Sequence, residues 1–278
     1  MGAARFVAGE TLDSCVAVLR KLNDAGLYAN TTLLGEAIPN EDGAAAVTAD
    51  YEQIIERLVS EKLKANVALK LTHLGLSFAE ETAYANVARL VERAGKLGTF
   101  IRIDMEQSEY VDPTLRLYER LRDAGHDAVG TVLQSYLYRT VGDLERLLPR
   151  NPNLRIVKGA YLEPAAIAYP DKADVDRAYF GLVERGLRGG AYIAVATHDE
   201  AIIRRVQAFT AREGIARDRF EFQMLFGVRP ALQRSIAADG YKVLVASPFG
   251  PDWYSDLMRR LAERPANLGF FLRNLVRR

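Results

Sequence analysis

The feature that most limits how this chain can fold is an alternation of short β-rich runs with longer segments of helical period. It continues to the C-terminus and predicts βα units around a parallel sheet. We expect about eight strands, the number that closes a (β/α)8 barrel, at 28–34, 67–71, 100–104, 129–134, 154–158, 192–196, 220–224 and 242–246. We expect an outer ring of amphipathic helices at 51–63, 80–96, 114–124, 143–148, 174–188, 200–212 and 230–238.

Further helical segments flank this pattern. A helix at 11–25 precedes the first strand, and we expect it to close the lower end of the barrel. Helices at 254–262 and 268–276 make the last unit longer than a barrel needs, and we expect the final helix to lie over the barrel mouth. No linker divides the chain. The sequence therefore predicts one α/β domain over residues 1–278, a modified (β/α)8 TIM barrel.

Charge and composition narrow the classes of partner. The 37 Lys and Arg residues nearly cancel 36 Asp and Glu residues, so the chain has no overall field to hold nucleic acid, and a small molecule is the expected partner. Cys15 is the single cysteine and has no internal disulfide partner. No apolar stretch is long enough to span a bilayer, and the first residues lack a secretory pattern. We expect a cytoplasmic protein.

Polar residues stand where the predicted strands end, and this is the most informative feature for function. In a barrel these positions converge on one mouth, where barrel enzymes place their active sites. Any one of them could be an ordinary solvated loop residue, but that interpretation is a poor account of the whole set. They are Lys70, Asp104, Gln134, Lys158, His198 and Gln223.

Several common sites are not indicated. No G-x-G-x-x-G follows a predicted strand, and no P-loop, zinc-ligand spacing or G-x-S-x-G elbow occurs. His73, His126 and His198 have no neighbouring Cys, His or Asp at metal-ligand spacing. We therefore expect no metal, and no Rossmann-type dinucleotide site.

Eight short motifs occur in a fixed order along the chain. They are LLGE at 33–36, LKLT at 69–72, RIDME at 102–106, VLQSYL at 132–137, RIVKGAY at 155–161, ATHD at 196–199, EFQMLFG at 221–227 and RRLAE at 259–263. In this order they resemble the motifs of the proline dehydrogenase family. The resemblance runs from about Phe6 to the C-terminus and is to the monofunctional enzyme, because the chain has no room for an aldehyde dehydrogenase module.

The resemblance implies a cofactor and a reaction. Members of this family bind FAD and oxidise L-proline to Δ1-pyrroline-5-carboxylate by hydride transfer to flavin N5, the first step of proline catabolism. The electrons pass to quinone or another acceptor, and a pyrroline-5-carboxylate dehydrogenase acts downstream. A peripheral association with the inner face of the membrane is left open.

The resemblance also assigns roles in catalysis and substrate binding. Arg259 and Arg260 would hold the substrate carboxylate, for which the bidentate geometry of arginine is suited. Glu36 would latch onto an arginine of this pair as a gate, Glu263 would pair with Lys70, and Asp104 would join the polar network around Lys70. Glu106 would support this network without contacting the substrate. For Glu36, Glu263 and Lys70 the alternative is a surface ion pair worth roughly 0–1 kcal/mol.

The flavin contacts implied by the resemblance come from the middle of the chain. Arg155, Gln134 and Lys70 are expected to touch the flavin, while Thr197 and His198 would lie at the adenine side. Ile156, Tyr161 and Leu225 would pack on apolar ring carbons, although a core role competes for Ile156 and Leu225. The remaining expected cofactor contacts are Lys158, Gly159, Ala160 and Gln223.

Two positions depart from the family pattern. Thr32 stands where the family usually has an aspartate, four residues before Glu36. Ala246 stands where it usually has a tyrosine that touches the substrate ring, so the pocket would be looser or be filled by Phe249 or Tyr254.

Two alternatives remain open. The first is another flavin barrel, such as a methylenetetrahydrofolate reductase-like enzyme, which would need a pteridine slot in place of the arginine pair. The second is an inactive barrel that binds a nucleotide.

Overall fold

The computed structural model describes residues 3–35, 38–251 and 253. Its eight strands form a closed parallel barrel in chain order, with β1 paired to both β2 and β8. The strands are β1 (Tyr28–Leu33), β2 (Ala65–Leu69), β3 (Ile101–Ile103), β4 (Val129–Gln134), β5 (Asn153–Val157), β6 (Tyr192–Ala196), β7 (Phe220–Leu225) and β8 (Val243–Phe249). The predicted fold class is confirmed.

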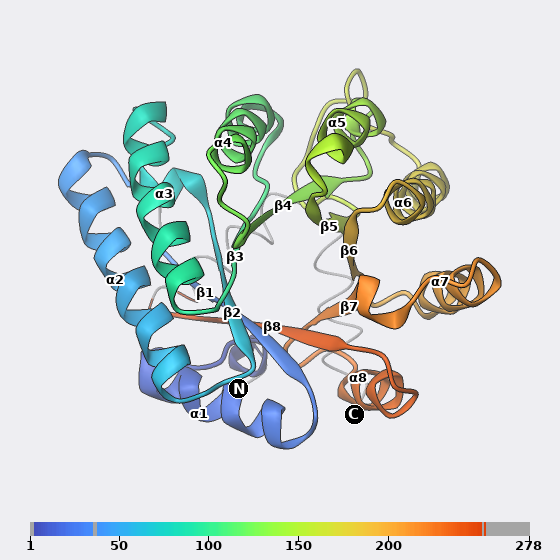
Figure 1. The fold of residues 1–278 in the computed structure, drawn as a ribbon, viewed down its shortest axis with the longest axis horizontal. Coiled ribbons are helices and arrows are strands. Elements are labelled where there is room, and N and C mark those ends of the chain that lie inside the picture. The colour runs from blue at the N-terminus through green and yellow to red at the C-terminus, as the bar shows by residue number, and fades with distance from the viewer. Residues whose placement is uncertain (1–2, 36–37, 252, 254–278) are drawn as a thin grey trace.

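Eight α-helices of the described part surround this barrel (Figure 1). They are α1 (Leu12–Asp24), α2 (Glu41–Ser60), α3 (Glu80–Lys96), α4 (Val111–Asp123), α5 (Thr140–Leu147), α6 (Lys172–Arg188), α7 (Glu200–Arg212) and α8 (Pro230–Ala238). Short 3-10 helices lie at Ala3–Phe6, Leu71–Leu74, Ser108–Tyr110, Leu148–Arg150 and Arg217–Arg219. None of the described helices is both long enough and apolar enough to cross a membrane. The expected helices at 254–262 and 268–276 lie outside the described residues.

Helix α2 begins at Glu41, earlier than the predicted start at 51. Its cap is Asn40, whose Oδ1 accepts a hydrogen bond of 2.9 Å from the Gly43 amide. Asparagine is a favoured residue at this position because it satisfies an amide that has no partner in the helix. The first turns contain glycine and alanines rather than large apolar residues, so the apolar period became visible only from Tyr51 onward.

The expectation that α1 closes the lower end of the barrel is wrong. Its apolar stripe, which includes the buried Cys15 and Leu19, lies on the outside of the wall, and Cys15 Sγ is 3.2 Å from Thr31 Oγ1 in β1. The segment before it follows β8, because the Ala8 amide donates to the Pro248 carbonyl at 2.7 Å. Helix α1 thus fills the slot beside β1 and β8 (Figure 1), where its stripe is shielded from water by the barrel wall.

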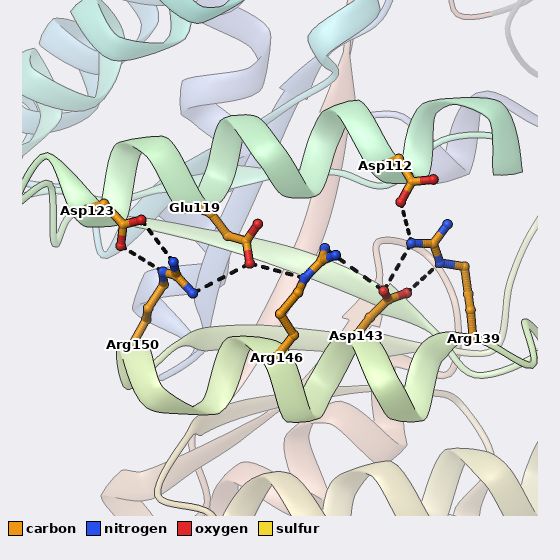
Figure 2. A network of polar contacts seen from close by, with 7 residues as sticks. All are labelled: Asp112, Glu119, Asp123, Arg139, Asp143, Arg146 and Arg150. Carbon is orange, nitrogen blue, oxygen red and sulfur yellow. Dashed lines mark hydrogen bonds and ion pairs between the residues drawn. The ribbon is translucent and has the colours of Figure 1, made fainter.

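A chain of alternating charges joins α4 to α5 on the outside of the barrel (Figure 2). Asp143 lies between Arg139 and Arg146 and is buried, and its carboxylate accepts a hydrogen bond of 2.8 Å from Arg139 Nε. Arg146 Nε contacts Glu119 of α4 at 3.1 Å. The other members are Asp112, Asp123 and Arg150.

Asp143→Asn should lower the free energy of unfolding by about 1–3 kcal/mol, because it removes a buried charged acceptor and leaves the Arg139 guanidinium poorly satisfied. Asp123→Asn is the matched control, since it removes a carboxylate of the same network whose side chain is 58% exposed, and it should have no measurable effect. Urea denaturation of both variants measures the difference. Equal losses in the two variants would show that burial does not set the strength of this network.

Candidate functional site

The side chain of Arg155, in β5, is buried inside the barrel and joins four strands there. Its Nε donates to Gln223 Oε1 of β7 at 2.6 Å, and Nη1 donates to Asp104 Oδ1, just beyond β3, at 2.6 Å. Its Nη2 donates to Asn30 Oδ1 of β1 at 3.2 Å. A guanidinium has five N–H groups, and no residue that the structure describes engages the other two. The side chain of Arg155 therefore faces the lumen and not the solvent between the helices.

Two amide side chains continue this network. Gln223 Nε2 donates to Glu221 Oε1 at 2.5 Å, and Asn30 Nδ2 donates to Asn66 Oδ1 at 2.5 Å. Sequence reasoning missed Asn30, Asn66 and Glu221. Glu221 could have been found, because it lies two residues before Gln223 and so points to the same side of β7.

Glu106 links the ends of β2, β3 and β4. Its buried carboxylate accepts from the Thr72 hydroxyl at 2.7 Å and from the Thr72 amide at 3.2 Å, and its carbonyl accepts from Gln134 Nε2 at 3.0 Å. Burial raises the pKa of Glu106 above its usual value, although Thr72 and the charge of Lys70 oppose that rise. Glu106 therefore orients Gln134 and lies within the field of Lys70.

Lys158, directly after β5, lies between two carboxylates. Its Nζ is 2.5 Å from Asp176 of α6 and 3.3 Å from Asp199 at the start of α7. Gly159 follows with a φ of +120°, a conformation that L side chains rarely adopt, and a Cβ there would lie 2.3 Å from the Tyr136 ring. Ala160 is exposed and Tyr161 is partly buried in the same loop.

His198, after β6, is held as a neutral acceptor. Its Nε2 accepts a hydrogen bond of 2.8 Å from the Leu225 amide. Burial, together with the positive charge of Arg229, lowers the pKa of His198 from 6.5 to about 4. The hydroxyl of the preceding Thr197 accepts from the Asp199 amide at 3.1 Å. The imidazole thus fixes the end of β7 against the end of β6.

The low pKa of His198 predicts a loss of stability in acid. As the pH falls from 6.5 towards 4, the unfolded chain takes up a proton that the folded chain excludes. The parent should therefore lose up to about 3 kcal/mol more folding free energy than His198→Gln between about pH 7 and about pH 4. Denaturant titrations across this range test it, and parallel pH profiles for the two proteins would contradict it.

The register of the barrel corrects one predicted contact. Ile156 pairs with Val195 on the face that carries Ile193, and Ile193 packs against Gly186 of α6. The side chain of Ile156 is therefore buried between barrel and helices and does not face the lumen, so the prediction that it packs on the flavin is wrong. Its neighbour Arg155 points inward because successive residues of a strand alternate.

Leu225 and Ala246 lie at the mouth on the inner side of the wall. They pair with each other across β7 and β8, and Ala246 also pairs with Asn30, whose side chain reaches Arg155 in the lumen. Leu225 is exposed and Ala246 is half-buried.

The predicted gate and carboxylate residues Glu36, Arg259, Arg260 and Glu263 lie outside the described residues.

Comparisons with known proteins agree with one another. The chain matches the family described as Proline dehydrogenase over residues 15–273. Proline dehydrogenase of Deinococcus radiodurans is 44% identical over 279 residues, which span 99% of this chain and 90% of that protein. Proline dehydrogenase 1 of Bacillus subtilis strain 168 is 40% identical and covers 100% of this chain and 92% of that protein.

The barrel also resembles a solved structure of a longer protein. The crystal structure of proline utilization A from Bdellovibrio bacteriovorus, inactivated by N-propargylglycine, superposes with a TM-score of 0.85 at 23% identity. The match covers 93% of this chain and 32% of that one, so this chain spans about a third of the solved protein's length. The likeness is one of fold.

Proposed function

Because this chain belongs to the proline dehydrogenase family of flavin-dependent oxidoreductases, we propose that it binds FAD and oxidises L-proline to Δ1-pyrroline-5-carboxylate. The observation that carries this proposal is the guanidinium of Arg155, which three oxygen acceptors hold in the barrel lumen. A fixed positive charge with two donors that no described residue engages suits a site where negative charge builds up on a reduced ring.

The chemistry of the residues around Arg155 fits a flavin. Gln134 offers a side-chain amide whose orientation Glu106 fixes, and the exposed Leu225 offers an apolar surface for a planar ring. His198 is neutral and engaged at Nε2, so it adds no charge beside an adenine. Gly159 brings backbone to the mouth without a Cβ. We assign Arg155, Gln134 and Lys70 to the isoalloxazine, and Thr197 and His198 to the adenine side.

Arg155, Gln134 and Lys70 would hold an FAD that supplies the two-electron acceptor for a hydride from proline C5, while the proline nitrogen loses a proton to solvent. In this proposal Arg259 and Arg260 bind the carboxylate and orient the ring, Glu263 holds Lys70, and Glu36 closes the site. Asp104 acts as the counter-ion of Arg155, a contact that supports its place beside the flavin. Lys158, Gly159, Ala160 and Gln223 complete the cofactor side, and Tyr161, Leu225 and Ala246 complete the substrate side.

The two electrons would pass on to quinone or another acceptor, at the inner face of the membrane or in the cytoplasm. A pyrroline-5-carboxylate dehydrogenase would oxidise the product further.

The test is spectroscopic. The purified protein, supplied with FAD, should show flavin absorption bands that bleach anaerobically when L-proline is added. Pyrrolidine is the matched control, because it has the same ring without the carboxylate that the arginine pair would bind, and it should leave the bands intact.

Two outcomes would contradict the proposal. Bleaching by a reduced nicotinamide but not by L-proline, with the bands restored by methylenetetrahydrofolate, would favour the methylenetetrahydrofolate reductase-like alternative. Absence of flavin bands after FAD addition would favour the inactive nucleotide-binding barrel.

A further inference from the structure

We infer that Glu221, in the lower part of the lumen, is a positioning residue that acts on the flavin through Gln223 and Arg155. The inference rests on the proposed function, since it concerns the same site. Glu221 lies in β7 two residues before Gln223, and both face the lumen.

Glu221 is a buried carboxylate whose two oxygens are both engaged. Oε1 accepts from Gln223 Nε2 at 2.5 Å, and Oε2 accepts from the Tyr192 hydroxyl at 2.9 Å and lies 2.8 Å from Lys242 Nζ. Burial alone would raise the pKa of Glu221, but Lys242 and the hydrogen bonds hold it below its usual value. The carboxylate therefore carries its charge at neutral pH.

This charge sets the orientation of the amide above it. A side-chain amide presents a carbonyl on one side and an NH2 on the other. Because a carboxylate only accepts, the Gln223 NH2 must face Glu221, and its carbonyl must then face Arg155 Nε, where the distance is 2.6 Å. Glu221 thus prevents the amide flip that would place two donors against each other and release the guanidinium.

Stability alone does not explain a row of polar contacts inside the barrel. The lumen of a TIM barrel is usually filled by branched apolar side chains, and apolar replacements of a buried ion pair are often at least as stable. Here the polar contacts run without a break from Lys242 at the lower end through Glu221 and Gln223 to Arg155, which is assigned to the isoalloxazine. Groups that orient a functional side chain in this way are typically worth about 10–100-fold in activity.

The experiment compares Glu221→Gln, Lys242→Met and the double variant as flavin-loaded proteins. Glu221→Gln should slow flavin reduction by L-proline about tenfold with unchanged KM, and should raise the midpoint potential because it removes a negative charge near the flavin. Lys242→Met should shift the potential downward, and the double variant should restore it. Lys242 is partly exposed, so its variant provides a test even where Glu221→Gln does not fold.

A structural role predicts a different pattern. Asp143→Asn, which removes a buried carboxylate outside the lumen, is the control for lost stability, and it should leave potential and rate unchanged. If the potentials of Glu221→Gln and Lys242→Met both equal that of the parent, whatever their melting temperatures, Glu221 does not act on the flavin. A parent that L-proline fails to bleach would instead overturn the proposed function, so the two failures are distinguishable.

Discussion

Arg155→Met should lower the rate at which L-proline reduces the flavin by about 100-fold or more, the scale expected when one preorganised charged donor is lost. The change removes the charge and leaves the oxygens of Asp104, Gln223 and Asn30 without the donor that they share. Asp104 would lose the guanidinium that pairs with it in the lumen, so stability should fall as well. Anaerobic stopped flow measures the reduction rate, and absorbance at fixed protein concentration measures how much flavin is retained.

Arg102→Met is the matched control for this variant. Arg102 is also a buried arginine of the lumen, but it lies two residues before Asp104 and donates to the backbone carbonyls of Thr131 at 2.8 Å and Asn153 at 2.7 Å. Burial and the charge of Arg155 lower its pKa to about 10, so it remains protonated at neutral pH. Both variants should lose stability. Only Arg155→Met should also slow flavin reduction when the rate is calculated per bound flavin. Equal slowing per bound flavin would assign the effect to a distorted barrel.

The barrel could be predicted from sequence because its signal is local. The pattern of apolar and polar residues that identifies a strand or a helix lies within that element. The predicted bounds agree with the structure for β4, β6, α3, α7 and α8. The position of α1 was not predictable in the same way. An apolar stripe shows that a helix packs against something, but the slot beside β1 and β8 is identified by long-range contacts, those of Cys15 with Thr31 and of Ala8 with Pro248.

For the candidate site, too, local features could be predicted from the sequence and long-range contacts could not. Residues at strand ends could be predicted because one topological rule brings all of them to the mouth. Pairings inside the lumen could not, since Arg155 and Asn30 are separated by 125 residues in sequence. The error at Ile156 has a simple cause. Successive side chains of a strand point alternately into the lumen and outward, and a sequence motif alone does not show which of its residues point into the lumen.

Ala246→Tyr should raise the preference for L-proline over 4-hydroxyproline by about 10–100-fold, measured as the ratio of kcat/KM values. Ala246 is half-buried in β8, and its register with Leu225 and Asn30 places it on the lumen side near Arg155. A tyrosine there would bury ring carbons of proline and crowd a substituent at C4, while alanine does neither. The parent should accordingly bind proline weakly and discriminate poorly.

Ser247→Ala is the control on the same strand. Its backbone carbonyl accepts from Thr31, whose side chain faces α1 rather than the lumen, so the substrate ratio should stay at the parental value. Ala246→Leu separates the two parts of the effect, because leucine fills the apolar volume but lacks the ring that would close over C4. It should recover part of the proline affinity and little of the discrimination. If Ala246→Tyr leaves the ratio of kcat/KM values unchanged, Ala246 does not contact the substrate ring, and the substrate ring does not lie beside Leu225.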